Sequence, residues 1–188
     1  MAYCVHCGKE VSPEARMCPQ CGHPGPAAQR AIAAAGELAS WGHRLGAYLL
    51  DAIVLAIPGL ILFVTLVLPR LDDITVTEDG ELHGASASDA GSFALAIILF
   101  AIIAVLYKPL MEGANGQTLG KKWTGLRVVL EDGGGRIGYG KAWFRWFIGA
   151  IANIVPFGSF VDHLWPLWDD NKQTLHDKAA KTIVVKTA

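Results

Sequence analysis

The sequence predicts a mainly α-helical membrane protein, a small helical bundle with a separate N-terminal module and a short pair of cytoplasmic strands. Hydrophobic residues make up 52% of the 188 residues and charged residues only 18%, against roughly 25% charged in soluble domains. Long apolar stretches cover residues 45–68, 92–111 and 144–168. All four cysteines precede residue 22, so no disulfide is expected in the main body.

Residues 1–25 are expected to fold around a metal ion, because this segment has too few apolar residues to form a core. Its cysteines form two CxxCG pairs, and four thiolates suit a tetrahedral, structural Zn²⁺ site. The predicted ligands are Cys4, Cys7, Cys18 and Cys21. A pair of disulfides and a redox dithiol are the alternatives. His6 and His23 are interpreted as bystanders, and reduced thiolates favour the cytosol.

Residues 26–42 are interpreted as a linker. The Pro24-Gly25-Pro26 sequence ends the metal module, and the alanine-rich segment that follows favours a helix. A spacer is the simpler interpretation. The alternative is an interfacial helix, with Trp41 at the level of the lipid headgroups.

The first apolar stretch, residues 45–68, is long enough to cross a bilayer core of about 30 Å. Arg44 stands at its start, and Asp51 is the one ionisable residue inside it. A carboxylate at this depth costs a few kcal/mol or more, so Asp51 needs a partner or a function. Pro58 predicts a kink that serves packing.

Charge predicts the topology of the next segments. Residues 70–91 are acidic, with Arg70 as their one basic residue, and a short hairpin is predicted around Asp79-Gly80. The second span, 92–111, is expected to end at Pro109, and residues 112–143 are rich in Lys and Arg. Because basic loops stay in the cytoplasm, the N-terminus and residues 112–143 are predicted to be cytoplasmic. The protein is expected to be a multi-pass protein of the inner membrane.

The third apolar region, 144–168, can cross the membrane once or form a hairpin that turns at Pro156–Ser159. The hairpin is favoured by the two segments that flank it. Residues 126–130 (LRVVL) and 182–186 (TIVVK) both read as strands, and an isolated strand is not stable in water. If these strands pair, both ends of the region lie on the same face of the membrane.

Three sequence features together resemble the RDD family of bacterial membrane proteins, over roughly residues 41–186. They are Arg44 with Asp51 seven residues later, the segment GQTLGKKWTGLRVV after the second span, and QTLHDKAAKTIVV near the end. The resemblance implies that the family arginine is Arg44, its aspartates are Asp51 and Asp177, and its loop motif is Gly116, Thr118, Gly120, Lys121 and Gly125. It also implies a small helical membrane domain at 43–188, and transport of solutes or sodium–proton exchange as the proposed activity.

The charged residues suggest one site. Arg44 and Asp51 lie on the same side of a helix but about 10 Å apart, so each needs another partner. We expect Arg44, Asp51 and Asp177 to form one network near the cytoplasmic face. It either fixes helix register or handles ions. Lys121 and Lys122 are expected to meet Asp177 or anionic lipid, and His176 is interpreted as a surface or capping residue.

Other functions are disfavoured. The GQTLGKK segment lacks the spacing of a P-loop, no nucleophile–base set is evident, and a net charge of −1 gives no case for nucleic acid. No enzyme is expected. The main hypothesis is a membrane protein for solute or cation/proton movement, embedded in lipid as a homo-oligomer. The alternative is a membrane-anchored adaptor that recruits a cytosolic protein through its N-terminal four-cysteine module, which resembles the short zinc ribbons found at the termini of many bacterial proteins.

Overall fold

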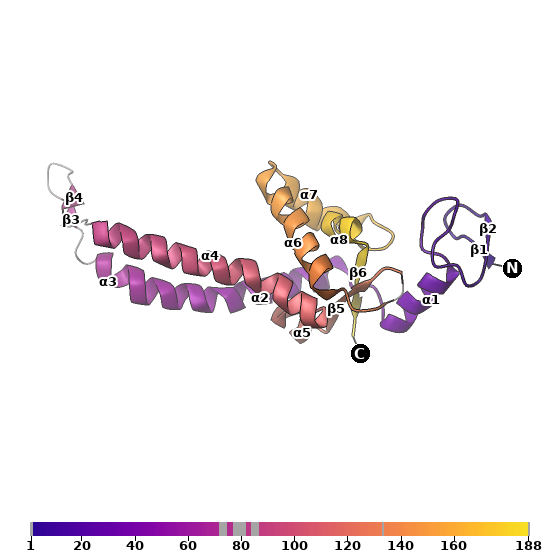
Figure 1. Ribbon diagram of the computed structural model, residues 1–188, viewed down its shortest axis with the longest axis horizontal. Helices are drawn as coiled ribbons and strands as arrows, with labels where there is room; N and C mark the ends of the chain where they lie inside the picture. Colours follow the sequence, from indigo (N-terminus) through magenta and orange to yellow (C-terminus); the bar gives the residue numbers. More distant parts are fainter. Residues whose placement is uncertain (1, 72–74, 77–81, 84–86, 133, 188) are drawn as a thin grey trace.

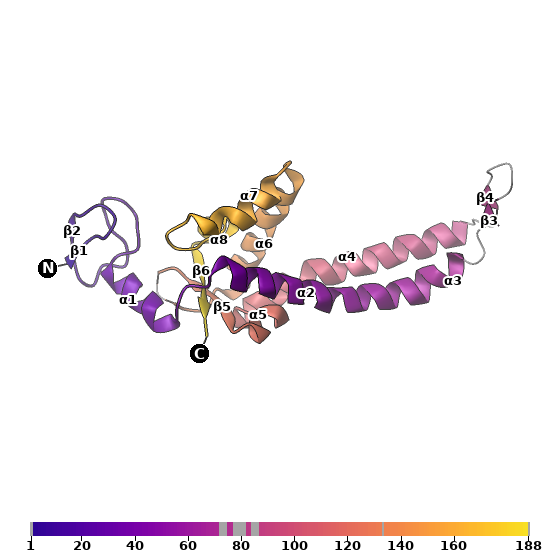
Figure 2. The ribbon, with the colours of Figure 1, turned by 180° about the vertical axis from the view of Figure 1, so that it is seen from behind.

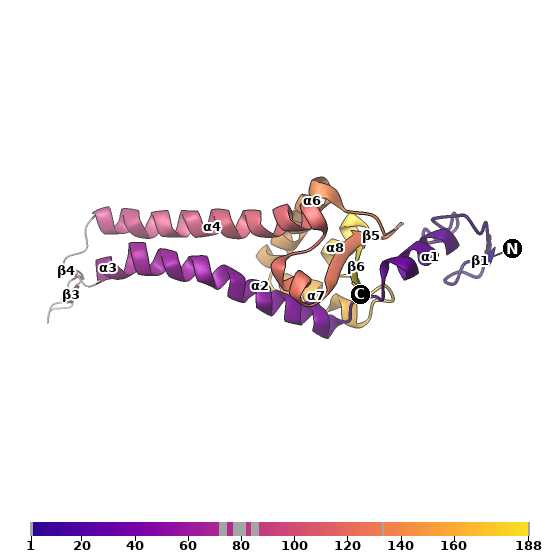
Figure 3. The ribbon, with the colours of Figure 1, turned by 90° about the horizontal axis from the view of Figure 1, so that it is seen from below.

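The computed structural model describes residues 2–71, 75–76, 82–83, 87–132 and 134–187. It is mostly helical and elongated (Figure 1). Two long helices run side by side away from a small mixed body, and the cysteine-rich segment lies at the opposite end. The same arrangement is seen from behind and from below (Figures 2 and 3).

The first long helix combines α2 (Trp41–Leu62), the π-helical turn η1 (Phe63–Val67) and α3 (Leu68–Leu71). It is 31 residues long, and its most apolar part has no buried residue. Ile53, Ile57 and Leu60 are 58–63% exposed. Such a continuous apolar surface is unstable in water, so lipid is the solvent that suits it. The helix also continues through Pro58, as the sequence requires for a span.

The second long helix, α4 (Ala87–Asn115), corrects the expected end at Pro109. The helix continues for six residues beyond this proline. It ends where Gly116, with φ of +72°, donates its N–H to the Glu112 carbonyl oxygen over 2.7 Å. Tertiary contacts stabilise this last turn, because Glu112 is buried in ion pairs and Gly113 packs closely on Tyr139. They outweigh the hydrogen bond that proline removes.

The predicted pairing of residues 126–130 and 182–186 is confirmed. Strands β5 (Leu126–Leu130) and β6 (Thr182–Lys186) are antiparallel, with Val128 opposite Val184. One face of the pair packs with Ala47 of α2 and Ala142 of α6 (Gly138–Ile154). The first long helix, α6 and the strands therefore share one hydrophobic cluster.

The linker is more than the spacer it was expected to be. Its helix, α1 (Pro26–Ala35), was predicted from the alanines, but Ile32 and Leu38 pack on the second face of the β5–β6 pair. Leu38 also forms a bridge with Val185 at the free edge of β6. The reason is that β6 is apolar on both faces, so the chain covers both the face and the edge.

The third apolar region consists of two helices rather than one. Helix α6 ends at Ile154, Phe157 takes a left-handed conformation with φ of 61°, and α7 (Gly158–Leu164) follows. The 3₁₀ turn η2 (Trp165–Leu167) then leads toward α8 (Leu175–Ala180). Helices α6 and α7 lie side by side (Figures 1 and 2), which is the geometry that the hairpin interpretation requires.

Two small antiparallel pairs complete the structure. The N-terminal segment contains β1 (Ala2–Tyr3) and β2 (Glu10–Val11). The acidic loop contains β3 (Thr75–Val76) and β4 (Leu82–His83), in agreement with the predicted hairpin. The expected turn at Asp79-Gly80 lies outside the described residues.

Candidate functional site

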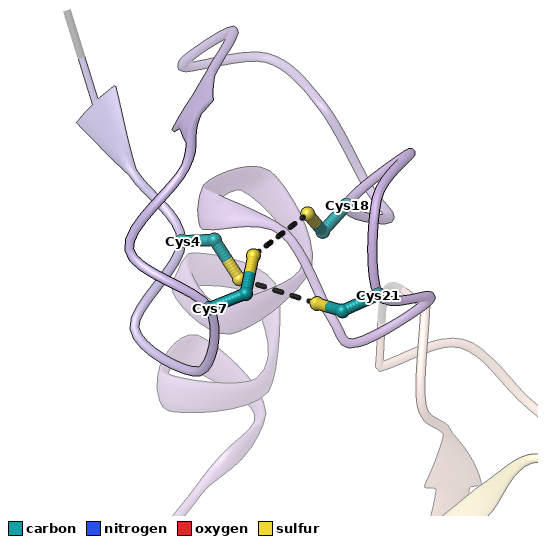
Figure 4. Close-up of side chains that lie close together, drawn as sticks. All are labelled: Cys4, Cys7, Cys18 and Cys21. Carbon is teal, nitrogen blue, oxygen red and sulfur yellow. Dashed lines mark hydrogen bonds between the residues drawn. The ribbon is translucent and has the colours of Figure 1, made fainter.

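The four cysteines form one cluster, as their spacing predicts (Figure 4). All four sulfur atoms lie within 4.8 Å of one another, and the Cys4–Cys21 and Cys7–Cys18 pairs are 3.6 and 3.7 Å apart. A tetrahedral Zn²⁺ with Zn–S bonds of about 2.3 Å places its sulfurs about 3.8 Å apart. The four cysteines are free and not joined in disulfides. The cluster therefore fits a four-thiolate metal site, and the disulfide alternative is wrong.

Backbone N–H groups lower the pKa of two of these thiols, which favours the thiolate form that binds a metal cation. The N–H groups of Cys7 and His6 lower the pKa of the Cys4 thiol to about 6, and those of Cys21 and Gln20 lower that of Cys18. At Cys21 the His23 N–H also lowers the pKa, but burial and the neighbouring sulfurs outweigh it and raise the pKa to about 12. A divalent cation would remove this competition among thiolates, since metal binding displaces the protons.

Asp177, predicted as a site residue, lies at the centre of a buried ion pair with two arginines. Its two carboxylate oxygens are each 2.6 Å from a guanidinium nitrogen, one of Arg44 and one of Arg145. Asp177 is 0% exposed and the arginines are 2–3% exposed. Burial alone would raise the pKa of Asp177, but Arg145 and Arg44 outweigh it and hold this pKa well below its usual range. Asp177 is therefore a permanent anion at neutral pH.

A second buried pair joins the end of α4 to the loop motif. Lys121 donates to Oε1 of Glu112, and both side chains are 2% exposed. Glu112 Oε2 also lies 3.9 Å from Nε of Arg145, which connects this pair to Asp177. The expectation that Lys121 meets Asp177 or lipid is therefore wrong: its partner is Glu112. Lys122 beside it is exposed.

A third pair is formed by Asp162 and His176, both buried. One oxygen of Asp162 lies 2.7 Å from Nδ1 of His176, and the other accepts the His176 backbone N–H over 3.0 Å. Burial lowers the pKa of His176 although Asp162 acts against it. His176 is therefore neutral at pH 7, with its proton on Nδ1, and the interpretation as a surface or capping residue is wrong.

Asp51 does not belong to the network of Arg44 and Asp177, which corrects the expectation of one site. Its carboxylate accepts three hydrogen bonds, from Tyr107 Oη (2.7 Å), Thr118 Oγ1 (2.6 Å) and the Gly120 N–H (2.7 Å). Neutral donors thus replace the cation that the sequence led us to expect, because three good hydrogen bonds can compensate a buried carboxylate. The structure separates Asp51 from Arg44 and Asp177.

The geometry of the loop motif brings two of these neutral donors to Asp51. Thr118 caps α5 (Leu119–Trp123) and at the same time donates to Asp51. A Cβ at Gly120 would overlap the Ala47 carbonyl oxygen and would lie 2.8 Å from the Asp51 carboxylate, so only glycine fits. Gly116 and Gly125 have positive φ values of 72° and 64° and turn the chain on either side. The motif therefore packs its backbone closely against the first long helix.

Sequence reasoning assigned no definite role to Glu112, Arg145, Asp162 and Tyr107. Each lies in or beside an apolar stretch, and an ionisable residue there is the signal that could have identified it. The sequence could not pair them, because the ion pairs join residues up to 133 positions apart.

A cavity of about 590 Å³ lies beside these ion pairs, between α4, α6 and α7. Charged and polar residues line much of it, and we call it the charged cavity. Its lining residues are Lys108, Glu112, Arg145, Trp146, Gly149, Ala150, Asn153, Ser159, Asp162, His163 and His176. This volume falls in the range of sites for small molecules, about 300–1,000 Å³.

Comparison with known proteins gives two family matches. A model described as RDD family matches residues 38–181, and one described as a zinc-ribbon domain matches residues 3–24. The proline-rich antigen homolog of Mycobacterium tuberculosis (strain ATCC 25618 / H37Rv) is 38% identical over 74 residues, 39% of this chain and 30% of that protein. The proline-rich antigen of Mycobacterium leprae (strain TN) is 35% identical over 75 residues, 38% and 28% respectively. The chain thus spans less than a third of these relatives. No solved structure gives a significant match.

Proposed function

The chain belongs to the RDD family, and from this premise we propose that it moves a small ion or polar solute across the bacterial inner membrane. The charged cavity carries the proposal. A membrane protein seldom keeps buried charges beside a cavity unless they serve a ligand or a pathway. Here that space lies at one end of two helices that have the length and composition of membrane spans.

We propose that the N-terminus and the charged cavity are on the cytoplasmic side. The support is the distribution of charge: residues 112–143 are rich in Lys and Arg, while the 70–91 loop at the other end of the long helices is acidic. In this orientation the α6–α7 hairpin enters and leaves by the cytoplasmic face. The orientation is tested by introducing a single cysteine either at residue 187 or in the acidic loop. Each variant is then labelled from outside in intact cells. Labelling of residue 187 from outside would contradict this orientation.

Transport further requires a homo-oligomer in the bilayer. Residues 52–69 of the first long helix and 90–106 of the second contain no ionisable residue, so one chain offers no charged path through the outer half of the membrane. Their large apolar side chains are exposed along both helices, which leaves room for other copies or lipid. We therefore place any complete pathway between copies of the chain.

The cation/proton form of the proposal is tested separately at Asp51, which does not line the charged cavity but is the buried carboxylate inside the first long helix. Purified protein is reconstituted in vesicles that contain a pH-sensitive dye, and pulses of Na⁺ or K⁺ are applied. We expect proton movement with wild-type protein, and its loss with Asp51→Asn. Glu37→Gln, which removes an exposed carboxylate, is the matched control. Unchanged exchange in Asp51→Asn at equal protein level would end the ion-handling role of Asp51.

A second candidate function, a membrane-anchored adaptor, is favoured by the surface of the zinc ribbon. Tyr3, Val5 and Met17 are 49–80% exposed on this small module, which lies away from the long apolar helices (Figure 1). We propose that the module holds a structural Zn²⁺ and presents these side chains to a cytosolic protein. Co-purification of a soluble partner that is lost in both Cys4→Ser and Cys18→Ser, but kept in Lys9→Ala, would support this function over transport.

A further inference from the structure

We propose that the charged cavity is a binding site for an oxyanion, that is, a carboxylate or phosphate group. The proposal rests on the proposed function in one respect, since it names the chemical class of the ligand that the cavity would hold. Its test measures binding and does not depend on transport.

The first reason is a buried guanidinium with donors to spare. Arg145 is 2% exposed and lines the cavity, and its Nη2 is engaged by Asp177 at 2.6 Å. Its Nη1 and Nε have no hydrogen-bond partner among the residues that the structure describes. The nearest carboxylate oxygen to Nε, from Glu112, is 3.9 Å away, which is too long for a hydrogen bond. A buried donor without an acceptor is costly, so these atoms call for an acceptor from outside the chain.

The second reason is Lys108, which lines the same cavity. Its ammonium group lies 4.9 Å from the centre of the Tyr48 ring, a cation–π contact. Within the part of the chain that the structure describes, Lys108 takes part in no ion pair. The cavity thus has a lysine and an arginine that both retain unused N–H donors, and such a combination recognises carboxylate and phosphate oxygens.

Three of the four carboxylate oxygens in the cavity wall accept hydrogen bonds within the chain, and the fourth, Glu112 Oε2, lies 3.9 Å from Arg145 Nε, which argues against a cation. Glu112 accepts from Lys121. Both oxygens of Asp162 accept hydrogen bonds from His176, one from its backbone and one from its ring. Lys108 and Arg145 thus leave several N–H donors unused, whereas the unpaired acceptor nitrogen that the described residues contribute to the wall is His176 Nε2, so donors are in excess. The two cations and two carboxylates in the lining cancel in formal charge, so the arrangement of donors decides the sign of the ligand.

The remaining wall indicates what the anion is attached to. Trp146, Gly149 and Ala150 give the cavity an apolar side, and about 590 Å³ is more than a lone phosphate ion fills. The ligand is therefore an organic acid, a phosphate ester or the headgroup of an anionic lipid, which share this chemistry. The experiment separates the soluble sources from the lipid.

The first test measures binding to the full chain in detergent. Sodium phosphate and sodium succinate are titrated at constant ionic strength, with sodium chloride as the reference, and the dissociation constant is obtained by calorimetry. We expect binding that weakens about tenfold or more in Lys108→Met, since a charge-assisted hydrogen bond is lost. Lys122→Met, at an exposed lysine on α5, is the matched control and should bind as the wild type does. Equal binding by Lys108→Met and wild type would overturn the proposal.

The second test uses lipid nanodiscs that contain phosphatidylglycerol or only phosphatidylcholine. Stabilisation by phosphatidylglycerol that is lost in Lys108→Met, with no binding of phosphate or succinate, assigns the site to a lipid headgroup. Binding of either soluble anion assigns it to a soluble ligand. No response to any of them overturns the proposal.

Two further measures keep the outcome clear. If Lys108→Met fails to fold, Ala150→Leu narrows the cavity without removing a charge, and it should also weaken binding. Flux is measured separately: binding without flux in vesicles would refute the transport function and leave the site, while flux without anion binding would refute the site alone.

Discussion

Neutralising Asp177 tests the central claim that the ion pairs hold the body together. Asp177→Asn keeps the shape of the side chain and an oxygen that can accept from Thr174 N–H, 3.3 Å away in the wild type, but it removes the charge between Arg44 and Arg145. Arg44 then loses its carboxylate partner, and Arg145 keeps only Glu112, whose Oε2 lies 3.9 Å from its Nε. Loss of one member of a buried ion pair costs about 3–5 kcal/mol. At about 2–4 °C per kcal/mol for a chain of this size, we expect Tm to fall by roughly 6–20 °C.

The assay is thermal unfolding in detergent, followed by tryptophan fluorescence. The matched control is Glu37→Gln, because Glu37 pairs with Lys186 at 3.1 Å but is 76% exposed. An exposed pair contributes about 1 kcal/mol or less, so its Tm should move by less than about 4 °C. If Asp177→Asn shifts Tm no more than Glu37→Gln does, the reasoning about buried charge is refuted.

Three other predictions follow from the same structure. Chelation of the metal, or the substitution Cys18→Ser, should release about one Zn²⁺ per chain and unfold residues 2–25. The helical circular dichroism signal of the long helices should remain. Retention of zinc by Cys18→Ser would contradict the four-thiolate site. Gly120→Ala should destabilise by about 2 kcal/mol or more through its overlap with the Ala47 carbonyl, whereas Gly42→Ala, with no heavy atom within 4 Å, should be neutral or slightly stabilising in Tm measurements. Burial lowers the pKa of His176, so just below the usual histidine pKa of about 6.5 the unfolded chain binds more protons than the folded chain. Stability should therefore fall as pH decreases from 7 to 5. His176→Asn should flatten this dependence of Tm on pH.

The sequence allowed the strands, the long helices and the four-cysteine cluster to be predicted because each depends on local pattern. Val, Ile and Thr, which are β-branched, make up much of LRVVL and TIVVK, and the CxxCG spacing brings the sulfurs of each pair close together. The end of α4 could not be predicted in this way. Local chemistry stops a helix near Pro109, and only the ion pair between Glu112 and Lys121 shows why the helix continues.

The partners of the buried charges were the least predictable part of the site. From the sequence, Asp51 was expected to join Arg44 and Asp177 in one network and to have a further partner, because a lone carboxylate in an apolar helix is costly. In the folded chain Asp51 instead faces a hydroxyl of α4 and the start of α5. Which donor reaches a carboxylate depends on the approach of helices from distant parts of the chain.

By itself, the amino-acid sequence predicted the surroundings of each segment: a four-cysteine metal site in water for residues 1–25, and lipid for the two long apolar stretches. Hydrophobicity and ligand spacing are local, so no contact between distant residues is needed to recognise them. The predicted grouping of Arg44 with Asp177 is confirmed, but only the tertiary structure decided that Arg145 joins them, that Asp51 lies in a separate cluster, and that a cavity with unused donors lies beside the ion pairs. The physical reason is that a buried charge is stabilised by whichever group the packing brings within about 3 Å, and that packing is a property of the whole fold.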